Sequence, residues 1–417
     1  MQSLKDWLKH RNKIENNILE NEKIIENAYL FLFGIFMLYY DSYTTMFNNQ
    51  WPDKFLLYLE LTLGVVVFYK FAVLECAEAK EAIFIAVILA FFIVVRVNTG
   101  YGQLLDTALL IVGAYKINYK KILKVYLGVS VPIIIWTMIA ARLELVTNLI
   151  YNQEGRIRES FGFVYPTDFA AHVFFVVVAW VLLRQVKCSL FELGGMIILV
   201  VFLAANCDSR NSELGILLIV GGVIYLKVMD YIAVKKNKKY YPSKLIKWVC
   251  LGSPIIFAPV MILLCRFYNP NNQIMSFLNK VTTERLKLGK RTFDNYDIQI
   301  LGQYVDMVGN GGSTEKPAYY TFIDCSYINI LMRYGLLIFI VVLLILEIIM
   351  LKNRSNLYIL GLIVVICLHS VMEHHLFEFY YNVFIILPFA SFQSVENFKN
   401  KKINREERKI CDETLRM

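Results

Sequence analysis

The chain has 417 residues, of which 57% are hydrophobic and 18% are charged, and its formal net charge is +9. Soluble domains average nearer half apolar and a quarter charged, so these values exclude a soluble globular protein. The apolar residues occur in blocks of roughly 17–22, the length that a helix needs to cross about 30 Å of hydrocarbon. We therefore predict an all-α integral membrane protein.

The chain begins with a polar segment, residues 1–27, whose apolar side chains fall roughly on one helical face: Leu4, Trp7, Leu8, Ile14 and Ile18. Such a face is typical of a helix that lies on the membrane surface. A partly ordered tail is the alternative. The first apolar block continues without a small-residue cleavage site, so no signal peptide is predicted.

About twelve transmembrane helices are predicted within a membrane domain of residues 28–396, and a basic tail of residues 397–417 follows. The spans lie near 28–45, 55–74, 82–97, 103–117, 122–140, 168–185, 190–206, 213–232, 248–265, 325–349, 357–372 and 379–396. No internal repeat, low-complexity tract or soluble domain is recognisable between them.

The basic residues predict the orientation, because positively charged loops stay in the cytoplasm. With the N-terminus inside, the cytoplasmic segments hold most of the lysines, including the run Lys235, Lys236, Lys238 and Lys239, and both termini are cytoplasmic. Arginine outnumbers lysine on the extracytoplasmic face. Guanidinium groups bind phosphate or carboxylate bidentately, so we expect this face to bind an anion.

Two long loops are predicted on that face, about 141–167 and about 266–324. The first carries Arg156 and Arg158, which could clamp a phosphate at the membrane surface or be two solvated charges. Asp168, after Pro166, could cap the next helix. A short outer turn then carries Asp208 and Arg210. Arg210 either forms a structural pair with Asp208 or points into a cavity to meet substrate.

The second long loop holds four cations within seven residues, Arg285, Lys287, Lys290 and Arg291, followed by the glycine-rich run 309–312. Cations beside glycine-rich backbone suit a diphosphate, and an ordinary solvated basic helix is the alternative.

The end of this loop and the next span supply further candidates. Asp324 and Tyr327 lead into the span, and Arg333 lies two turns deeper, where a charged side chain is a functional candidate by default. Tyr319, Tyr320 and Tyr327 are candidate sugar contacts.

Glu373, His374 and His375 lie between the last two predicted spans. A carboxylate beside two imidazoles can act as a general base, with simple solvated side chains as the alternative. Zinc is disfavoured, because adjacent histidines on one helix chelate poorly and the spacing H-E-x-x-H is missing. The eight cysteines include no C-x-x-C pair. We therefore expect no metal, no cofactor and no disulfide framework.

Together these residues resemble the bacterial polysaccharide polymerases of the Wzy type, within the O-antigen polymerase and ligase group. The likeness covers roughly residues 155–390 and rests on seven motifs, in chain order Arg158-x-Ser160-Phe161-Gly162-Phe163-x-x-Pro166, Ser209-Arg210, Arg291 with Gly302, Asp324-x-Ser326-Tyr327-Ile328, Tyr334-Gly335, Glu373-His374-His375 and Tyr381-Asn382. Thr167 and Val383 depart from the group, which often has Asn and Pro there.

The resemblance implies a metal-independent glycosyltransferase in the bacterial plasma (inner) membrane. It would polymerise oligosaccharide repeat units linked to undecaprenyl diphosphate into capsule, exopolysaccharide or O-antigen. Arg156, Arg158, Arg210 and Arg291 would hold the diphosphates, supported by Arg285 and Arg333, and one of Glu373, His374 and His375 would be the base. The expected partners are these lipids, the bilayer, a chain-length regulator and a flippase, with no nucleic acid.

Three other functions remain open. An O-antigen ligase would pass the same donor to a different acceptor, and the sequence discriminates it poorly from a polymerase. A flippase for lipid-linked oligosaccharides would need a cationic cavity inside the bundle, whereas the arginines here cluster in loops. A sensor or scaffold would tolerate replacement of the outer arginines.

Overall fold

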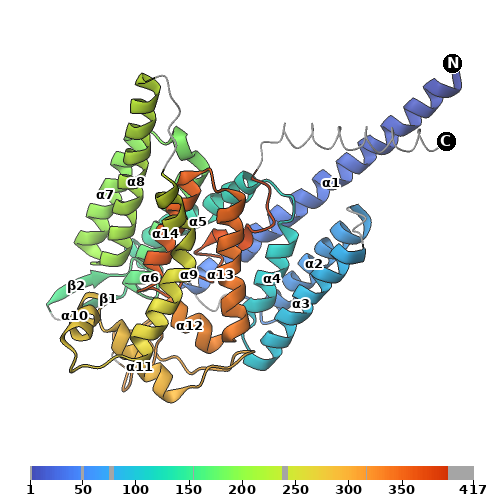
Figure 1. The fold of residues 1–417 in the computed structure, drawn as a ribbon. Helices are drawn as coiled ribbons and strands as arrows, with labels where there is room; N and C mark the ends of the chain where they lie inside the picture. Colours follow the sequence, from blue (N-terminus) through green and yellow to red (C-terminus); the bar gives the residue numbers. More distant parts are fainter. Residues whose placement is uncertain are drawn as a thin grey trace.

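The computed structural model describes residues 2–47, 51–74, 79–153, 155–236, 243–315 and 317–392, so the predicted tail 397–417 lies outside the described residues. Up to residue 187 it contains the elements α1 (Gln2–Tyr43), α2 (Phe55–Tyr69), the π-helix η1 (Lys70–Leu74), α3 (Ala79–Thr99), α4 (Gln103–Gly113), α5 (Tyr119–Arg142), β1 (Ile150–Gln153), β2 (Arg156–Glu159), α6 (Pro166–Arg184) and the 3-10 helix η2 (Gln185–Lys187) (Figure 1).

The remaining elements begin with a pair of neighbouring helices, α7 (Leu190–Asn206) and α8 (Arg210–Lys235). They continue with α9 (Lys244–Arg266), α10 (Gln273–Val281), α11 (Arg285–Asn295), α12 (Ser326–Arg333), α13 (Gly335–Lys352), α14 (Leu357–His369) and the 3-10 helix η3 (Val383–Ile386). Helix α1 packs on α2 and α5, α5 packs on α6, and α8 packs on α6, α7 and α14. The two strands form an antiparallel hairpin that pairs Tyr151 with Arg158.

Local signals explain where several helices begin. The Asn118 side chain accepts the N–H of Lys120 and caps α5, and Ser189 forms a reciprocal capping box with Glu192 at α7. Pro166 occupies the first turn of α6, where its missing N–H costs no helical hydrogen bond. The N-cap of α6 is Tyr165, so the prediction that Asp168 caps this helix is wrong.

Eight helices in the described part of the chain are long and apolar enough to cross a membrane: Glu20–Tyr43 within α1, Phe55–Ala72, α3, α5, Pro166–Lys187, α8, α9 and α13. The apolar helices α4, α7 and α14 are shorter. The structure is therefore that of a mostly helical, multi-pass membrane protein. The count of twelve and the sidedness of the termini stay predictions. The polar leader forms no separate helix over residues 2–27, because α1 runs unbroken from Gln2 to Tyr43.

The predicted span 325–349 is broken into α12 and α13. Gly335 at the break has a φ of +88°, which favours glycine, and an added Cβ would lie 2.2 Å from the Gly302 backbone nitrogen. The N–H of Gln303 donates to the Arg333 carbonyl at 3.0 Å. The loop around Gly302 thus packs on the helix break, so Gly302 has a packing role.

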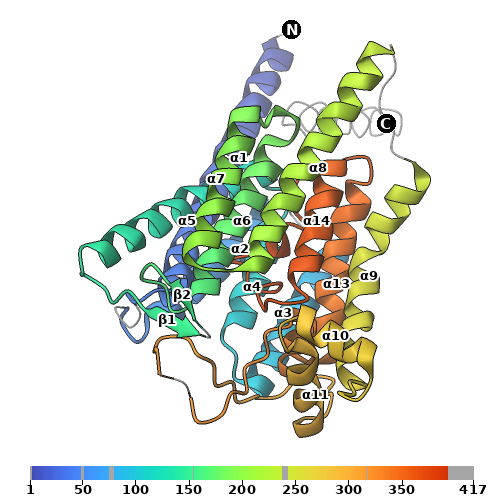
Figure 2. The same ribbon diagram turned by 90° about the vertical axis from the view of Figure 1, so that its left-hand side faces the viewer.

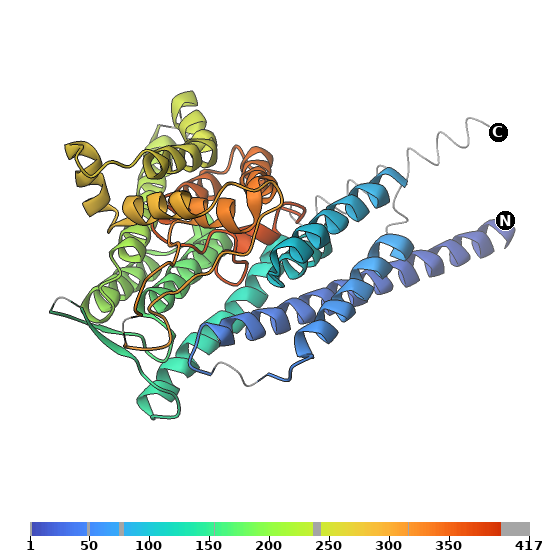
Figure 3. The same cartoon turned by 90° about the horizontal axis from the view of Figure 1, so that it is seen from below.

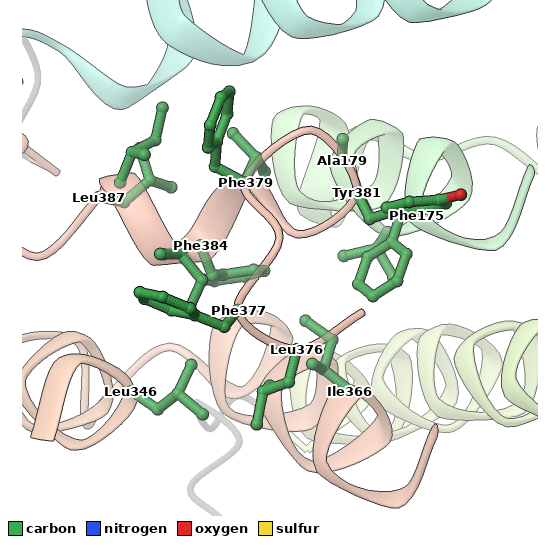
Figure 4. Close-up of a cluster of buried hydrophobic side chains, with 14 of the residues drawn as sticks. Phe175, Ala179, Leu346, Ile366, Leu376, Phe377, Phe379, Tyr381, Phe384 and Leu387 are labelled. Atoms are coloured by element: carbon green, nitrogen blue, oxygen red, sulfur yellow. The ribbon is translucent and has the colours of Figure 1, made fainter. Parts of the chain in front are cut away.

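The predicted last span, 379–396, is wrong as a helix over its described residues 379–392, where the only helix is the four-residue η3. This segment is buried by protein, and Figure 4 shows Phe379, Tyr381, Phe384 and Leu387 packed among side chains of other helices. Those side chains come from α6 (Phe175, Ala179), α13 (Leu346) and α14 (Ile366). Irregular backbone is tolerated at membrane depth where protein surrounds it.

Short turns satisfy the backbone of this segment. The N–H of Asn382 donates to the Glu378 carbonyl at 2.7 Å, and the N–H of Leu387 donates to the Phe384 carbonyl at 3.1 Å. Lys352, the last residue of α13, donates from Nζ to the Pro388 carbonyl at 2.6 Å. Leu376, just before this segment, bonds to Ser326 at the start of α12, and Pro388 bonds to Lys352 at the end of α13. The chain from Leu376 to Pro388 therefore runs along α12 and α13.

Candidate active site

Both long loops lie at one end of the bundle, where Figure 2 shows the hairpin β1–β2 together with α10 and α11. They contact each other, since the Tyr151 hydroxyl donates to the Asn310 carbonyl at 3.0 Å and the N–H of Gly312 donates to the Val164 carbonyl at 2.8 Å. The segments that the sequence predicted to share one face are therefore neighbours in space. Their side chains form the site described next.

His375 lies between two carboxyl groups, Glu378 and Asp168. Its Nδ1 lies 2.7 Å from Glu378 Oε2, and its Nε2 lies 3.7 Å from Asp168 Oδ1. A proton on Nδ1 satisfies the Glu378 contact and leaves the lone pair of Nε2 directed toward Asp168. Nε2 has no hydrogen-bond partner among the described residues, although His375 is 1% exposed. Burial lowers the pKa of His375 to about 3, so the imidazole is neutral near pH 7.

Stacked rings fix the orientation of this imidazole. Tyr381 stacks on His375 with ring centroids 3.8 Å apart, and on its other side Tyr381 stacks on His172 at 4.0 Å. The His374 ring lies 4.0 Å from that of His375 and meets the edge of Phe322 at 4.8 Å. The buried stack leaves His375 little rotational freedom, which preorganises Nε2.

Arg285 is a partly buried positive charge of the site. Its Nη2 lies 3.5 Å from Asp324 Oδ1, and its Nε donates to the Met372 carbonyl at 3.2 Å. The Tyr320 hydroxyl donates to the second oxygen of Asp324 at 3.0 Å. Burial raises the pKa of Asp324, although the Arg285 guanidinium opposes that shift. Arg285 therefore joins the loop 266–324 to the residue just before Glu373.

Ser326, the first residue of α12, holds the backbone around Glu373 in place. Its Oγ donates to the Glu373 carbonyl at 2.5 Å and accepts the N–H of Leu376 at 3.1 Å. Its own N–H donates to the Ser370 carbonyl at 3.0 Å. The turn that carries Glu373, His374 and His375 is thus fixed by backbone contacts on both sides.

Burial raises the pKa of Glu373 to about 8. The Arg285 guanidinium opposes this rise, and the Asp324 carboxyl adds to it. The unfolded carboxyl would ionise near 4.5. The stability that neutral Glu373 contributes is therefore complete below pH 4.5 and is lost as the pH rises toward 8.

Glu373→Gln keeps the side chain neutral at every pH, so its stability relative to wild type should increase between pH 5 and pH 8. We expect an increase of at least about 1.4 kcal/mol, which corresponds to one unit of pKa shift. Unfolding of both proteins in detergent micelles at the two pH values measures it. An equal difference at both pH values would show that Glu373 ionises normally.

Arg158 links two parts of the site. Its Nε donates to the Cys207 carbonyl at 2.7 Å, and its guanidinium lies 5.5 Å from the centre of the Tyr165 ring. The same guanidinium lowers the pKa of Glu373, so it lies near that carboxyl as well. Arg158 is buried. It therefore extends from the turn before α8 toward Glu373.

Asp208 brings Arg156 and Arg210 together at the rim. Its Oδ2 accepts from Arg156 Nη1 at 2.9 Å, and its Oδ1 accepts from Arg210 Nε at 3.2 Å. The predicted Asp208–Arg210 pair is present, but the Arg210 side chain is 76% exposed. Such exposed pairs contribute little to stability, so Arg210 remains accessible to an anion at the N-terminus of α8.

Of the other predicted residues, Arg291 and Tyr327 lie apart from this centre, whereas Arg333 lies near Glu378. Arg291 donates to the Tyr320 carbonyl at 2.9 Å and lines a cavity of about 40 Å³ with Tyr320. Arg333 lies 4.3 Å from the centre of the Tyr101 ring and near Glu378, whose pKa it lowers against the rise that burial causes. Tyr327 is fully buried and its hydroxyl donates to the Cys367 carbonyl at 2.8 Å, which gives it a packing role.

Asp168 and Glu378 lie at His375, although the sequence pattern predicts only a helix cap for Asp168 and no role for Glu378. Glu378 follows His375 by three residues, a spacing that brings side chains together in a turn as well as in a helix. That spacing indicates a contact between His375 and Glu378 only when the chain is known to turn there.

Glu373, His374 and His375 are also the described residues that could hold a metal ion. Their donor atoms lie within 4.8 Å of one another. Four-coordinate zinc, with bonds of about 2.0–2.1 Å, holds its ligand atoms about 3.4 Å apart. The three side chains would have to move closer to bind an ion.

Comparison with known proteins adds no relative: no family profile, no curated protein and no solved structure matches the chain.

Proposed function

We propose that the chain is a membrane glycosyltransferase that polymerises oligosaccharide repeat units linked to undecaprenyl diphosphate. One observation carries the proposal: a buried, neutral imidazole, whose Nε2 makes no hydrogen bond to the described residues, lies at the same end of the bundle as Arg158, Arg210 and Arg285. The imidazole can accept a proton, and guanidinium groups can hold a diphosphate. The motif resemblance supplies the substrate class.

In the proposed reaction, His375 Nε2 accepts the proton of the acceptor sugar hydroxyl while its oxygen bonds to the anomeric carbon of the donor. The bond from that carbon to the diphosphate breaks, and undecaprenyl diphosphate leaves with the electron pair. The proton on His375 later passes to solvent. Arginines at the rim and at Glu373 stabilise the charge that develops on the leaving diphosphate, so the proposal requires no metal ion.

Glu378 positions the base in this proposal, and Asp168 faces its reactive nitrogen. The Glu378 contact fixes which ring nitrogen carries the proton in the resting state. It also stabilises the imidazolium that forms when Nε2 accepts a proton. Localisation in a bacterial plasma membrane, a chain-length regulator and a flippase belong to the same proposal.

Deletion of the gene in its host tests the proposal, with polymer and lipid-linked intermediates separated on gels. We expect lipid-linked single repeat units to accumulate on the extracytoplasmic face of the membrane. Wild-type protein should restore long polymer. Arg210→Ala and Arg210→Lys at matched membrane levels should both shorten the polymer, because neither keeps the guanidinium fork.

The rival functions give different results. Unattached full-length chains after deletion would identify a ligase, and repeat units retained on the cytoplasmic side would identify a flippase. Unchanged polymer after deletion would refute all three functions.

A further inference from the structure

The second long loop contains an amphipathic helix, α10, whose apolar face is largely exposed. Ile274, Phe277 and Val281 are 71%, 64% and 57% exposed. Their spacing of three and four residues puts them on one side of the helix. Leu278 beside them is only partly buried and packs on the core. The three exposed side chains would contact water if nothing covered them.

The opposite side of α10 is fixed to the protein. The Asn279 side chain is buried, and its Nδ2 donates to Glu284 Oε1 at 2.9 Å while its Oδ1 accepts the N–H of Lys287 at 3.0 Å. Asn272 caps the helix by accepting the N–H groups of Ile274 and Met275. The exposed face is therefore held in a set direction.

This face continues the lipid-facing surface of a spanning helix. Leu263 and Phe267 at the end of α9 are 55% and 65% exposed, and only six residues separate Arg266 from the start of α10. The turn between the helices packs on α10, since the N–H of Asn269 lies 3.3 Å from the Met275 sulfur. Seen from the loop end in Figure 3, α10 lies at the edge of the molecule, beside α9.

Lysines flank the apolar face. Lys280 lies within α10, and Lys287 follows on α11; both are exposed. A helix with an apolar face bordered by lysines is typical of segments that lie in the headgroup region of a bilayer containing anionic lipid.

We infer that α10 lies in the membrane interface, with Ile274, Phe277 and Val281 inserted among the lipids and the lysines at anionic headgroups. The loop is then anchored to the bilayer at a point far from the bundle centre. Because Asn279 ties α10 to α11, Arg285 at the start of α11 is set at headgroup depth. This inference stands whether or not the proposed function is correct, since it concerns the lipid surface alone.

Phe277→Trp tests the inference in nanodiscs of phosphatidylglycerol and phosphatidylcholine, with and without bromine on the acyl chains. The protein has five tryptophans, so the added emission is the difference from wild type. Tyr319→Trp is the matched control, because Tyr319 is 56% exposed in the same loop. Neither side chain is part of the core, so both variants should fold.

Brominated lipid should quench the added emission of Phe277→Trp at least about twofold more than that of Tyr319→Trp. The added emission of Phe277→Trp should also shift to shorter wavelength when nanodiscs of phosphatidylcholine alone are replaced by nanodiscs that also contain phosphatidylglycerol. Equal quenching of the two variants would overturn the inference, because residue 277 would then lie no closer to the acyl chains than an ordinary loop residue.

Discussion

Replacing His375 by alanine should lower the rate of polymer formation about 10²–10⁴-fold, the usual contribution of a general base. The variant removes the neutral imidazole whose Nε2 has no hydrogen-bond partner in the described part of the chain. The measurement is turnover of purified protein in nanodiscs with lipid-linked repeat units from the host. Substrate binding should change little, so kcat falls while KM stays near its wild-type value.

The variants His374→Gln and Glu378→Ala distinguish the proposed base, His375, from the residues that support it. His374 has the same side chain but lies 3.8 Å from Glu378 through Nε2, so its loss should cost less than about tenfold. Glu378→Ala removes the contact that orients His375 and should lower kcat about 10–100-fold, as loss of such supporting contacts does elsewhere. If His374→Gln is the more damaging variant, His374 is the base and His375 supports it.

Replacing Arg285 by alanine should lower the free energy of unfolding by about 3 kcal/mol, the lower end for broken buried ion pairs. The lower end applies because Arg285 and Asp324 keep 17% and 12% of their side-chain exposure. The loss leaves Asp324 without its cation and frees the Met372 carbonyl. Unfolding in detergent micelles measures the effect.

Arg291→Ala is the matched control for this variant. It lies on the same helix but is exposed, and its loss should change stability by less than about 0.5 kcal/mol. Arg285→Lys keeps the charge without the fork and should fall between the two. Undecaprenyl diphosphate should stabilise wild type and Arg291→Ala but not Arg285→Ala. Equal losses of stability in Arg285→Ala and Arg291→Ala would show that the Arg285–Asp324 pair contributes no more than an exposed arginine does.

Hydropathy was enough to predict the membrane class and the positions of the long helices. It could not predict the structure of residues 379–392, because it measures how apolar a segment is and not what covers it. The run Val383–Ile386 is as apolar as a lipid-facing helix, yet its side chains pack against protein. The break between α12 and α13 at Gly335 could not be predicted either, because it depends on the close approach of the loop around Gly302.

The candidate site was predictable in its parts but not in its connections. Lysine-based orientation placed Arg158, Arg285 and Glu373 in segments that the structure brings together. The Glu378 contact with His375 depends on a turn whose shape Ser326 sets from fifty residues earlier in the chain. The three-residue spacing of His375 and Glu378 permits the contact, but only the fold of this turn establishes it.

The irregular segment after α14 has a consequence for biogenesis. A helix can enter the bilayer alone because its backbone is already hydrogen-bonded, whereas this segment depends on turns and on cover from α6, α13 and α14. It can reach its place only after those helices have been inserted and assembled. The segment that carries His375 and Glu378 is thus added after them, and a chain in which α6, α13 or α14 fails to insert never completes the candidate site.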